Sequence, residues 1–343
     1  MQRKKRVTLQ DVARRANVST AVVSYVINNG PRPTSPEVRQ RVLEAIEELG
    51  YHPNAFARGL RAQKTHTIGF IATDFYPFEV FTSHYCASIL TGVSEELKQR
   101  DYHLLVYPMV VGEDTEQLRR LLMGGRLDGV ILRLIEDSPA SREIVELIAS
   151  TQIPCVCIER ATDPRFHMPA IVYDDVKGAL EATSYLISRG HGLIAHLSGD
   201  PKYPTARARL EGYRRALAAA GLQGCELVVG DSWEMGEAVR STQELLRRGP
   251  RPTAIFAASD DLAIGAMAAI AQEGLRVGVD VAVVGFDDIP MASQTVPSLT
   301  TVRIPLLAMG RRAAEMLLQL ITSDDEPPAS EVVPLSLVAR GTA

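Results

Sequence analysis

The chain has 343 residues, of which 46% are hydrophobic, so it is too long for one core of ordinary size and predicts two or three packed domains. No run approaches the roughly 20 apolar residues of a membrane span, and the basic N-terminus leads into polar residues, so we expect a cytoplasmic protein that contacts no membrane. The first 64 residues hold 12 basic and 5 acidic residues, whereas the remainder holds 25 basic and 36 acidic residues. A head of net charge +7 on a body of net charge −11 predicts that the head meets phosphate and the body does not.

Residues 8–28 predict two short helices joined by a tight turn. Thr8 can cap the first helix, and Asp11 completes a capping box three residues later. Asn17 tolerates the left-handed backbone that ends this helix, and Ser19 can cap the second helix. The residues left outward near the start of the second helix, where a recognition helix meets base edges, are Thr20, Ala21, Ser24 and Tyr25. The pattern predicts a helix-turn-helix, for which an ordinary helical hairpin is the alternative.

A third helix is predicted between Ser35, a natural N-cap followed by proline, and Gly50, which completes an all-α head over residues 1–53. The next segment, 54–66, is predicted to hold a short helix and a linker. Isolated helices shorter than about 12–15 residues are marginal, and Gly59 weakens this one further. We therefore expect this segment to be helical only beside a partner.

From residue 67 onward, short apolar strands alternate with helical patterns. The predicted strands lie at 68–72, 104–107, 129–132, 153–158, 170–173, 193–197, 225–229, 254–257 and 281–286. Such alternation predicts parallel sheets that helices cover on both faces. Two such sets in tandem predict two similar lobes, with a ligand site beyond the carboxyl ends of the strands. The expected fold class is therefore an α/β core of two doubly wound lobes behind an N-terminal all-α head.

Residues that could carry catalysis or metal binding are scattered. The four cysteines lie outside any metal-ligand spacing, and we expect buried or idle thiols, with Cys155 and Cys157 facing opposite ways from one strand. The seven histidines form no metal-binding pattern, and no glycine-rich phosphate loop or nucleophile elbow is present. The sequence therefore predicts no metal, no cofactor and no enzymatic activity.

With these residues in view, the chain resembles the LacI family of bacterial transcription regulators over essentially its whole length. The stretches that carry the resemblance most specifically are 7–13, 18–20, 23–28, 50–54 and 57–60. Supporting matches are 128–131, 173–175, 190–191, 209–213, 259–265, 284–288 and 299–302. The resemblance implies a three-helix head, a hinge helix and a core shaped like the periplasmic sugar-binding proteins. Because the chain ends at Ala343 without the heptad tail of tetrameric members, a homodimer is expected.

The resemblance also implies how the chain divides between the lobes. In the family the chain crosses from one lobe to the other three times, so that its last part rejoins the first lobe. The implied boundaries are 67–169 plus 300–325 for the N-lobe and 170–299 plus 326–343 for the C-lobe.

For the head, the resemblance implies a DNA-reading surface. Base contacts are expected from Thr20, Ala21 and Tyr25, whose limited hydrogen bonding leaves much of the specificity to phosphates and DNA shape. Contacts to the DNA backbone are expected from Thr8, Ser19, Ser24, Asn28 and Arg39. With one recognition helix per chain, a dimer is expected on a pseudo-palindromic operator of double-stranded DNA.

For the hinge, the resemblance implies binding in the minor groove. The expected contacts are Asn54, Ala57, Arg58 and Leu60. Paired across the dimer, the leucines at position 60 would wedge into a base step and kink the duplex. A linker leucine that packs on the core is the alternative.

For the core, the resemblance implies an effector site in the cleft between the lobes. Its expected residues are Tyr85 and Cys86 from the N-lobe, with Tyr203, Thr205, Arg209, Trp233, Ser259 and Asp287 from the C-lobe. Arg209 and Asp287 can grip vicinal hydroxyls through charge-assisted hydrogen bonds, with a structural Arg–Asp brace as the alternative. Trp233, the single tryptophan, suits the apolar face of a sugar, with surface packing as the alternative.

These expectations combine into a repressor whose operator binding is switched by a small ligand, with a carbohydrate as the favoured class. Tyr203 stands where purine-responsive members carry arginine, which argues against a purine. A nucleobase corepressor on the same fold and a cytosolic solute-binding protein without a regulatory role are the alternatives. The aromatic segment 74–84 is longer than the family's usual first loop, and its role stays open.

Overall fold

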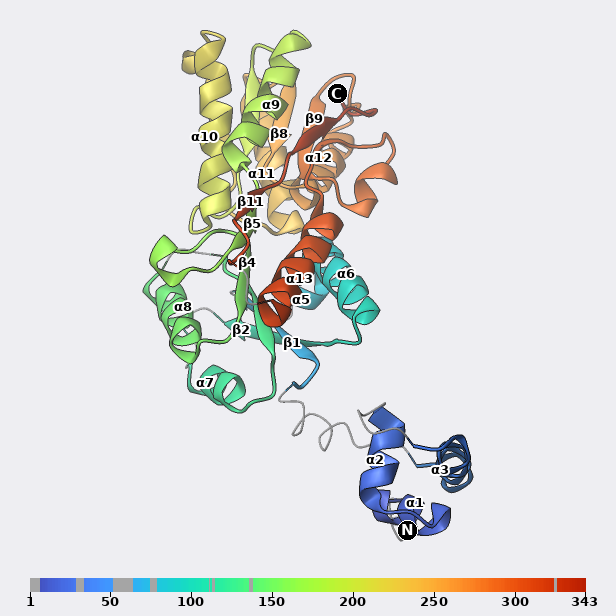
Figure 1. Ribbon diagram of the computed structural model, residues 1–343. Coiled ribbons are helices and arrows are strands. Elements are labelled where there is room, and N and C mark those ends of the chain that lie inside the picture. The colour runs from blue at the N-terminus through green and yellow to red at the C-terminus, as the bar shows by residue number, and fades with distance from the viewer. Residues whose placement is uncertain are drawn as a thin grey trace. The chain divides into compact units, whose positions relative to one another are not determined.

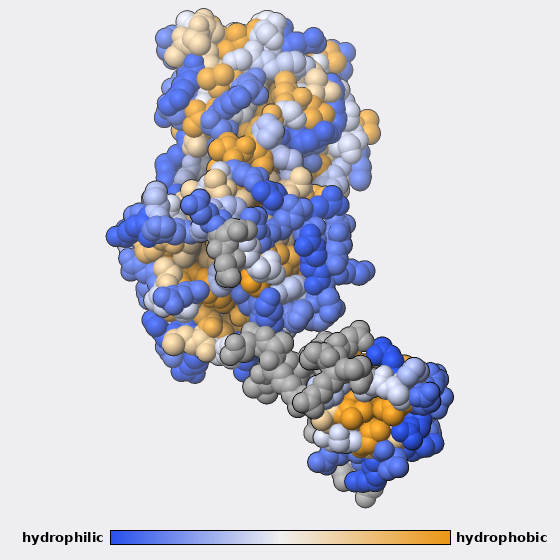
Figure 2. All heavy atoms as spheres, viewed as in Figure 1, coloured by the Kyte–Doolittle hydropathy of each residue, from blue (hydrophilic) through white to orange (hydrophobic). Residues whose placement is uncertain are grey.

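The computed structural model describes residues 7–28, 34–51, 64–74, 79–110, 112, 115–135, 138–323 and 326–343. The chain divides into two units, Met1–Thr65 and His66–Ala343, here called the head and the core (Figure 1). On the face seen in Figure 2, hydrophilic residues cover much of the surface of each unit. Hydrophobic residues gather in smaller patches among these hydrophilic residues. Among the described residues, no helix is both long and apolar enough to cross a membrane.

In its described residues, the head has the three helices that the sequence predicts. Its helices are α1 (Leu9–Ala16), α2 (Thr20–Asn28) and α3 (Pro36–Leu49). They close over a small core formed by Val12, Ala13, Ala16, Val23, Val26, Val42, Ala45 and Tyr51. The predicted hinge helix at 54–61 lies outside the described residues.

Local hydrogen bonds explain where the head helices begin and end. The Thr8 hydroxyl accepts from the Asp11 amide at 3.3 Å, and the Asp11 carboxylate accepts from the Thr8 amide at 3.0 Å, which confirms the capping box. Asn17 adopts φ 53°, the left-handed conformation that ends α1. Ser19 then accepts from the Val22 amide at 3.3 Å as the cap of α2. The helix-turn-helix is therefore confirmed.

The core holds two six-stranded sheets, one in each lobe. The first sheet has the order β11 (Glu331–Val332), β5 (Ala170–Val172), β4 (Cys155–Glu159), β3 (Gly129–Arg133), β1 (Thr67–Asp74), β2 (His103–Val110). The second has the order β12 (Ser336–Val338), β10 (Thr300–Arg303), β9 (Ala282–Asp287), β8 (Ala254–Ala257), β6 (Ile194–Leu197), β7 (Leu227–Val229). All pairs are parallel except that of β10 with β12.

Helices cover both faces of each sheet, as expected for apolar parallel strands (Figure 1). Around the first sheet lie α6 (His84–Gln99) and α13 (Leu306–Thr322) on one face, with α7 (Glu116–Met123) and α8 (Pro139–Thr151) on the other. Around the second lie α9 (Asp175–Ser188) and α10 (Pro204–Ala219) on one face, with α11 (Met235–Arg248) and α12 (Asp260–Gln272) on the other. The shorter elements are α5 (Glu79–Thr82), η1 (Pro164–Phe166), η2 (Gln223–Cys225) and η3 (Pro290–Ser293). The predicted doubly wound α/β core is confirmed.

Glycines let α6 and α13 cross closely. A Cβ at Gly92 would lie 2.1 Å from the Leu307 carbonyl oxygen, and a Cβ at Gly310 would lie 2.2 Å from the Ile89 carbonyl oxygen. Only a residue without a side chain fits such an approach of two backbones. The crossing holds α6 against the first sheet, with the first turn of this helix at the cleft described below.

Strand pairing corrects the expected lobe boundaries. β5 pairs with β4 in the first sheet, β10 pairs with β9 in the second, and β11 returns to β5 in the first. The boundaries expected at 170, 300 and 326 are therefore wrong by one strand each. Strands of two to four residues carry too few side chains to indicate which sheet they join, so only pairing decides it. The chain still crosses three times between the lobes, after β5, after β10 and after β11.

The orientation expected for two cysteines is also wrong. Cys155 and Cys157 both enter the apolar cluster on the α7–α8 face of the first sheet, whereas Val156 points to the opposite cluster. Side chains alternate along a strand with a period of two, so residues two apart share a face. All four cysteines carry free thiols, and three of them are buried.

Candidate functional site

The predicted DNA-reading residues of the head lie on and around α2. Thr20 and Ala21 are exposed and Tyr25 is half-buried, whereas Val23 and Val26 point into the head core. Among the expected backbone contacts, Thr8, Ser19 and Arg39 are exposed and Ser24 is half-buried. The side chain of Asn28 and the hinge residues Asn54, Ala57, Arg58 and Leu60 lie outside the described residues. The DNA contacts stay predictions.

All eight predicted effector residues line one cleft of about 500 Å³ between the lobes. The N-lobe contributes Tyr85 and Cys86 from the first turn of α6. The C-lobe contributes residues from the first two turns of α10 and its N-cap, from the segment before α11, from the N-cap of α12 and from the end of β9, namely Tyr203, Thr205, Arg209, Trp233, Ser259 and Asp287. Lining residues that the sequence analysis did not identify are Thr82, Ser83, Arg133, Glu159, Tyr173, Asp200, Lys202, Ser232, Glu234 and Asp261.

Arg209 is the most strongly held side chain of the cleft. Its Nε donates to Asp175 Oδ1 at 2.7 Å, and its Nη1 donates to Asp287 Oδ1 at 3.3 Å and to the Ala258 carbonyl oxygen. The guanidinium also lies over the Phe286 ring, 3.8 Å from its centroid. Burial opposes the charge of Arg209, but the carboxylates of Asp175 and Asp287 outweigh this and raise its pKa. A cationic donor is thus fixed at the floor of the cleft.

Asp287, at the end of β9, combines burial with a strained backbone. Its φ is 115°, a region that favours glycine. A residue held in such a region costs about 1–3 kcal/mol, and such strain gathers at ligand sites. Burial raises the pKa of Asp287, and Arg209 opposes this shift. The carboxyl is therefore held in place by the fold and lies directly against the ligand space.

Aromatic side chains form one wall of the cleft. The rings of Tyr203 and Trp233 meet edge to face, with centroids 5.8 Å apart. Trp233 Nε1 and Thr205 Oγ1 are buried without a hydrogen-bond partner in the described part of the chain. Buried polar atoms are paired in the great majority of cases, so two such atoms beside one cleft favour a polar ligand.

Gly199 leaves the space that the Trp233 ring of this wall occupies. A Cβ at position 199 would lie 2.4 Å from Trp233 Cζ2, so the indole packs directly on the backbone. We expect Gly199→Ala to push the indole aside, to shift the fluorescence of this single tryptophan and to weaken effector binding by about tenfold, because overpacking costs about 1–3 kcal/mol. Gly192→Ala, in the same lobe with nothing within 4 Å, is the control. Unchanged emission and affinity in Gly199→Ala would refute this role.

On the N-lobe side, two side chains at strand ends form an ion pair. Arg133 Nε, at the end of β3, donates to Glu159 Oε1, at the end of β4, at 2.5 Å. The Arg133 guanidinium lies 5.8 Å from the centroid of the Tyr85 ring, and the Tyr85 hydroxyl lies 2.7 Å from that of Tyr173. The rule that ligands bind beyond the carboxyl ends of parallel strands was the signal that could have identified Arg133 and Glu159.

A buried carboxyl lies under the C-lobe wall of the cleft. Asp260 Oδ2 accepts from the Ile289 amide at 2.8 Å, and Oδ1 accepts from the Thr301 hydroxyl at 2.5 Å. Burial raises the pKa of Asp260 to about 7. The carboxyl is therefore largely protonated in the folded protein at a pH where the unfolded chain has released this proton.

This difference predicts how stability depends on pH. The pKa of Asp260 is higher in the folded protein than in the unfolded chain. Its contribution to the free energy of unfolding is therefore lost as the pH rises from about 4 to about 7. Wild type is therefore expected to lose about 2 kcal/mol of unfolding free energy between pH 5.5 and pH 8, at about 1.4 kcal/mol per pKa unit. The amide of Asp260→Asn does not titrate, so the unfolding free energy of this variant should rise by that amount relative to wild type over the same range. Denaturant unfolding of both proteins at these two pH values measures the gain. A pH dependence identical to that of wild type would contradict the prediction.

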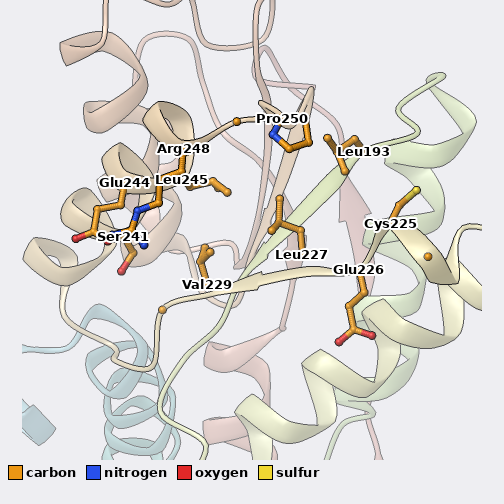
Figure 3. A pocket seen from close by; sticks show the side chains of 13 residues that line it. Leu193, Cys225, Glu226, Leu227, Val229, Ser241, Glu244, Leu245, Arg248 and Pro250 are labelled. Carbon is orange, nitrogen blue, oxygen red and sulfur yellow. Dashed lines mark ion pairs between the residues drawn. The ribbon is translucent and has the colours of Figure 1, made fainter.

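A second hollow, of about 540 Å³, lies at the edge of the C-lobe beside β7 and α11 (Figure 3). Its floor is apolar, with Leu193, Leu227 and Leu245. Its acidic groups already have partners, since Glu226 pairs with Arg214 and Glu244 pairs with Arg248. None of the predicted effector residues lines it. The cleft between the lobes is therefore the candidate ligand site.

Comparisons with known proteins agree with this arrangement. Residues 8–54 match the family described as bacterial regulatory proteins, lacI family, and residues 183–343 match a periplasmic binding protein-like domain. The ribose operon repressor of Escherichia coli (strain K12) is 36% identical over 343 residues, covering 98% of this chain and 99% of the relative.

Solved structures agree as well. The Lac repressor dimer bound to operator and the anti-inducer ONPF has a TM-score of 0.85 at 28% identity, covering 98% of this chain and 99% of the other. A complex of the transcriptional regulator CelR with cellobiose has a TM-score of 0.71 at 32% identity, covering 98% of this chain and 100% of the other. The chain belongs to the LacI family of ligand-regulated, DNA-binding bacterial regulators.

Proposed function

We propose that this protein is a cytoplasmic homodimeric repressor that releases or binds its operator when a neutral carbohydrate occupies the cleft between its lobes. The observation that carries the proposal is the meeting of Arg209, Asp287 and Trp233 in one cleft. An Arg–carboxylate pair can donate to one hydroxyl and accept from its neighbour, and an indole suits the apolar face of a sugar ring. We assign no catalytic activity to it.

The charge of the cleft favours a neutral ligand over an anionic one. Three lining side chains are cationic, namely Arg133, Lys202 and Arg209. Five are acidic, namely Glu159, Asp200, Glu234, Asp261 and Asp287. An excess of carboxyl groups at close range repels a phosphate or carboxylate on the ligand. A sugar without a charged substituent therefore fits better than a sugar phosphate.

The relatives support the same ligand class. One is named for the ribose operon, and a solved relative holds cellobiose. A pentose and a disaccharide differ in size but share rows of neighbouring hydroxyls, which the Arg209–Asp287 pair suits. At the head, we propose base contacts from Thr20, Ala21 and Tyr25 and a minor-groove wedge from Leu60. Because two heads of a dimer bind one site, we propose a pseudo-palindromic operator.

The experiment uses the fluorescence of Trp233, which lines the cleft and is the single tryptophan of the chain. Neutral sugars, sugar phosphates and purines are titrated against the dimer, and each binder is then added to a gel shift with the protein's own upstream DNA. We expect a neutral sugar to give a saturable change and to alter operator affinity. Binding of purines alone would favour the corepressor alternative. Sugar binding without an operator effect would favour a solute-binding protein.

A further inference from the structure

We propose that Arg340, which does not line the effector cleft, is a positioning residue that holds Asp287 in the place where it meets the effector. This inference rests on the proposed function, because it assigns the group that keeps a ligand-binding carboxyl in position. Arg340 follows β12 and reaches the end of β9. It acts through Asp288, the neighbour of Asp287, whose Oδ1 accepts from Arg340 Nη2 at 2.6 Å.

The backbone at the end of β9 is strained at two consecutive residues. Asp287 has φ 115° and Asp288 has φ 58°, both in the region that favours glycine. Residues with side chains stay in such conformations only where the surrounding structure holds them. The corner formed by these two residues therefore needs contacts that keep it from relaxing.

Two arginines hold Asp288 from outside the cleft. Its Oδ2 accepts from Arg303 Nε and its Oδ1 accepts from Arg340 Nη2, both at 2.6 Å. Only 8% of the Asp288 side chain and 17% of the Arg340 side chain are exposed, whereas 52% of the Arg303 side chain is exposed. Solvent and salt screen an exposed ion pair much more than a buried one. Arg340 is therefore the partner that fixes Asp288.

Arg340 also closes the loop that begins at this corner. Its Nη1 donates to the Leu299 carbonyl oxygen at 2.7 Å. One guanidinium thus joins the first residue after β9 to the last residue before β10. The planar fork of an arginine can hold two acceptors at once, whereas the ammonium of a lysine lacks this fixed geometry. The corner therefore cannot relax while both bonds of the guanidinium are kept.

The backbone that carries Arg340 is itself fixed in the second sheet. The Arg340 amide donates to Thr300 Oγ1 at 2.9 Å. Two residues later, the fully buried Thr342 hydroxyl accepts from the Thr300 amide at 2.8 Å and donates to the Val283 carbonyl oxygen at 2.6 Å. These bonds tie the segment to β9 and β10. The guanidinium therefore starts from a rigid base, as a side chain that positions another group requires.

Loss of these contacts has a direct consequence for the ligand. Without Arg340, the strained corner relaxes, and the Asp287 carboxyl moves with its backbone. A hydrogen bond weakens steeply when its angle or length departs from the preferred range. We therefore expect weaker effector binding in a protein that still folds.

The test titrates ribose, cellobiose and their monodeoxy analogues against the dimer and follows the fluorescence of Trp233. For Arg340→Met we expect about tenfold weaker sugar binding, because a charge-assisted bond that orients the site is lost. Arg340→Lys restores a cation without the planar fork, so we expect an intermediate loss. Arg214→Met is the matched control with unchanged binding, because its pair with Glu226 lies outside the cleft.

The ranking of the analogues separates positioning from general destabilisation. A displaced Asp287 loses its contact with one hydroxyl, so Arg340→Met should lose discrimination against the analogue that lacks this hydroxyl. A variant that only folds less well would weaken all analogues by the same factor, and this result would refute the positioning role. Asp288→Asn replaces Arg340→Met if the latter does not fold, because asparagine tolerates the left-handed backbone and removes only the charge. The same loss of discrimination is expected for it.

Hydrogen exchange tests the same role without any sugar. The Ile304 amide donates to the Asp287 carbonyl oxygen at 3.2 Å and therefore reports on the corner. In Arg340→Met we expect this amide to exchange about tenfold faster than in wild type, with no change in Arg214→Met. Faster exchange confined to residues 340–343 would overturn the proposal.

The two measurements keep this inference separate from the proposed function. If wild type binds a sugar and Arg340→Met binds it equally, with the same ranking of analogues, the positioning role is refuted and the proposed function stands. If no neutral sugar changes the fluorescence of wild type, the proposed function fails, and the exchange of the Ile304 amide alone decides whether Arg340 positions Asp287.

Discussion

Arg209→Met is expected to abolish the effector response and to destabilise the core by about 3–5 kcal/mol, the range for breaking a buried ion pair. Only 3% of the Arg209 side chain is exposed, and both Asp175 and Asp287 depend on it. Without the guanidinium, the buried Asp287 and the half-buried Asp175 lose the cation that they share, and the ligand loses its fixed donor. Thermal unfolding and sugar titration by Trp233 fluorescence measure the two effects.

Asp287→Asn separates ligand binding from stability. It keeps the size of the side chain and leaves the bond between Arg209 and Asp175, so we expect a smaller loss of stability but a comparable loss of sugar binding. Arg214→Met is the control, because its pair with Glu226 is solvent-exposed and exposed pairs contribute about 0–1 kcal/mol. An unaltered dose–response curve in Asp287→Asn or Arg209→Met would show that the pair is only a structural brace.

Operator affinity is expected to fall by about 10³–10⁵ between 50 mM and 200 mM salt, the range for 6–10 phosphate contacts. Each head carries a net charge of +7 over its first 64 residues, and a dimer brings two heads to one site. Phosphate contacts release counterions, and high salt opposes this release. Titration of the operator at several salt concentrations gives the slope.

Substitution of one arginine of α3 tests the predicted contacts to the DNA backbone. Arg39 and Arg41 are both exposed, but only Arg39 is predicted to meet phosphate. Arg39→Ala should lower the salt slope by about 1 per chain and weaken all sequences alike, whereas Arg41→Ala should leave the slope unchanged. Full affinity with one chain per site, or a slope near zero, would contradict the dimeric electrostatic interface.

The head shows what local sequence determines. The capping box of Thr8 and Asp11, the left-handed Asn17 and the cap at Ser19 each involve residues within three positions of one another, so their geometry follows from short-range chemistry. The alternation of apolar strands and helices determined the layered core in the same way, because each element must bury one or both faces. The resemblance to a family then indicated the eight cleft residues.

Contacts between distant segments were decided only by the tertiary structure. The pairing of Arg133 with Glu159 joins two strands 26 residues apart, and neither residue carries a local signal of its partner. The placement of β5, β10 and β11 likewise depends on which sheet edge offers unpaired backbone, since strands this short have almost no pattern of their own. The sequence by itself determined the helix ends, the alternation and the class of fold, because these depend on neighbours along the chain. The tertiary structure decided the lobe of each short strand and the second wall of the cleft, because these depend on residues that meet only after folding.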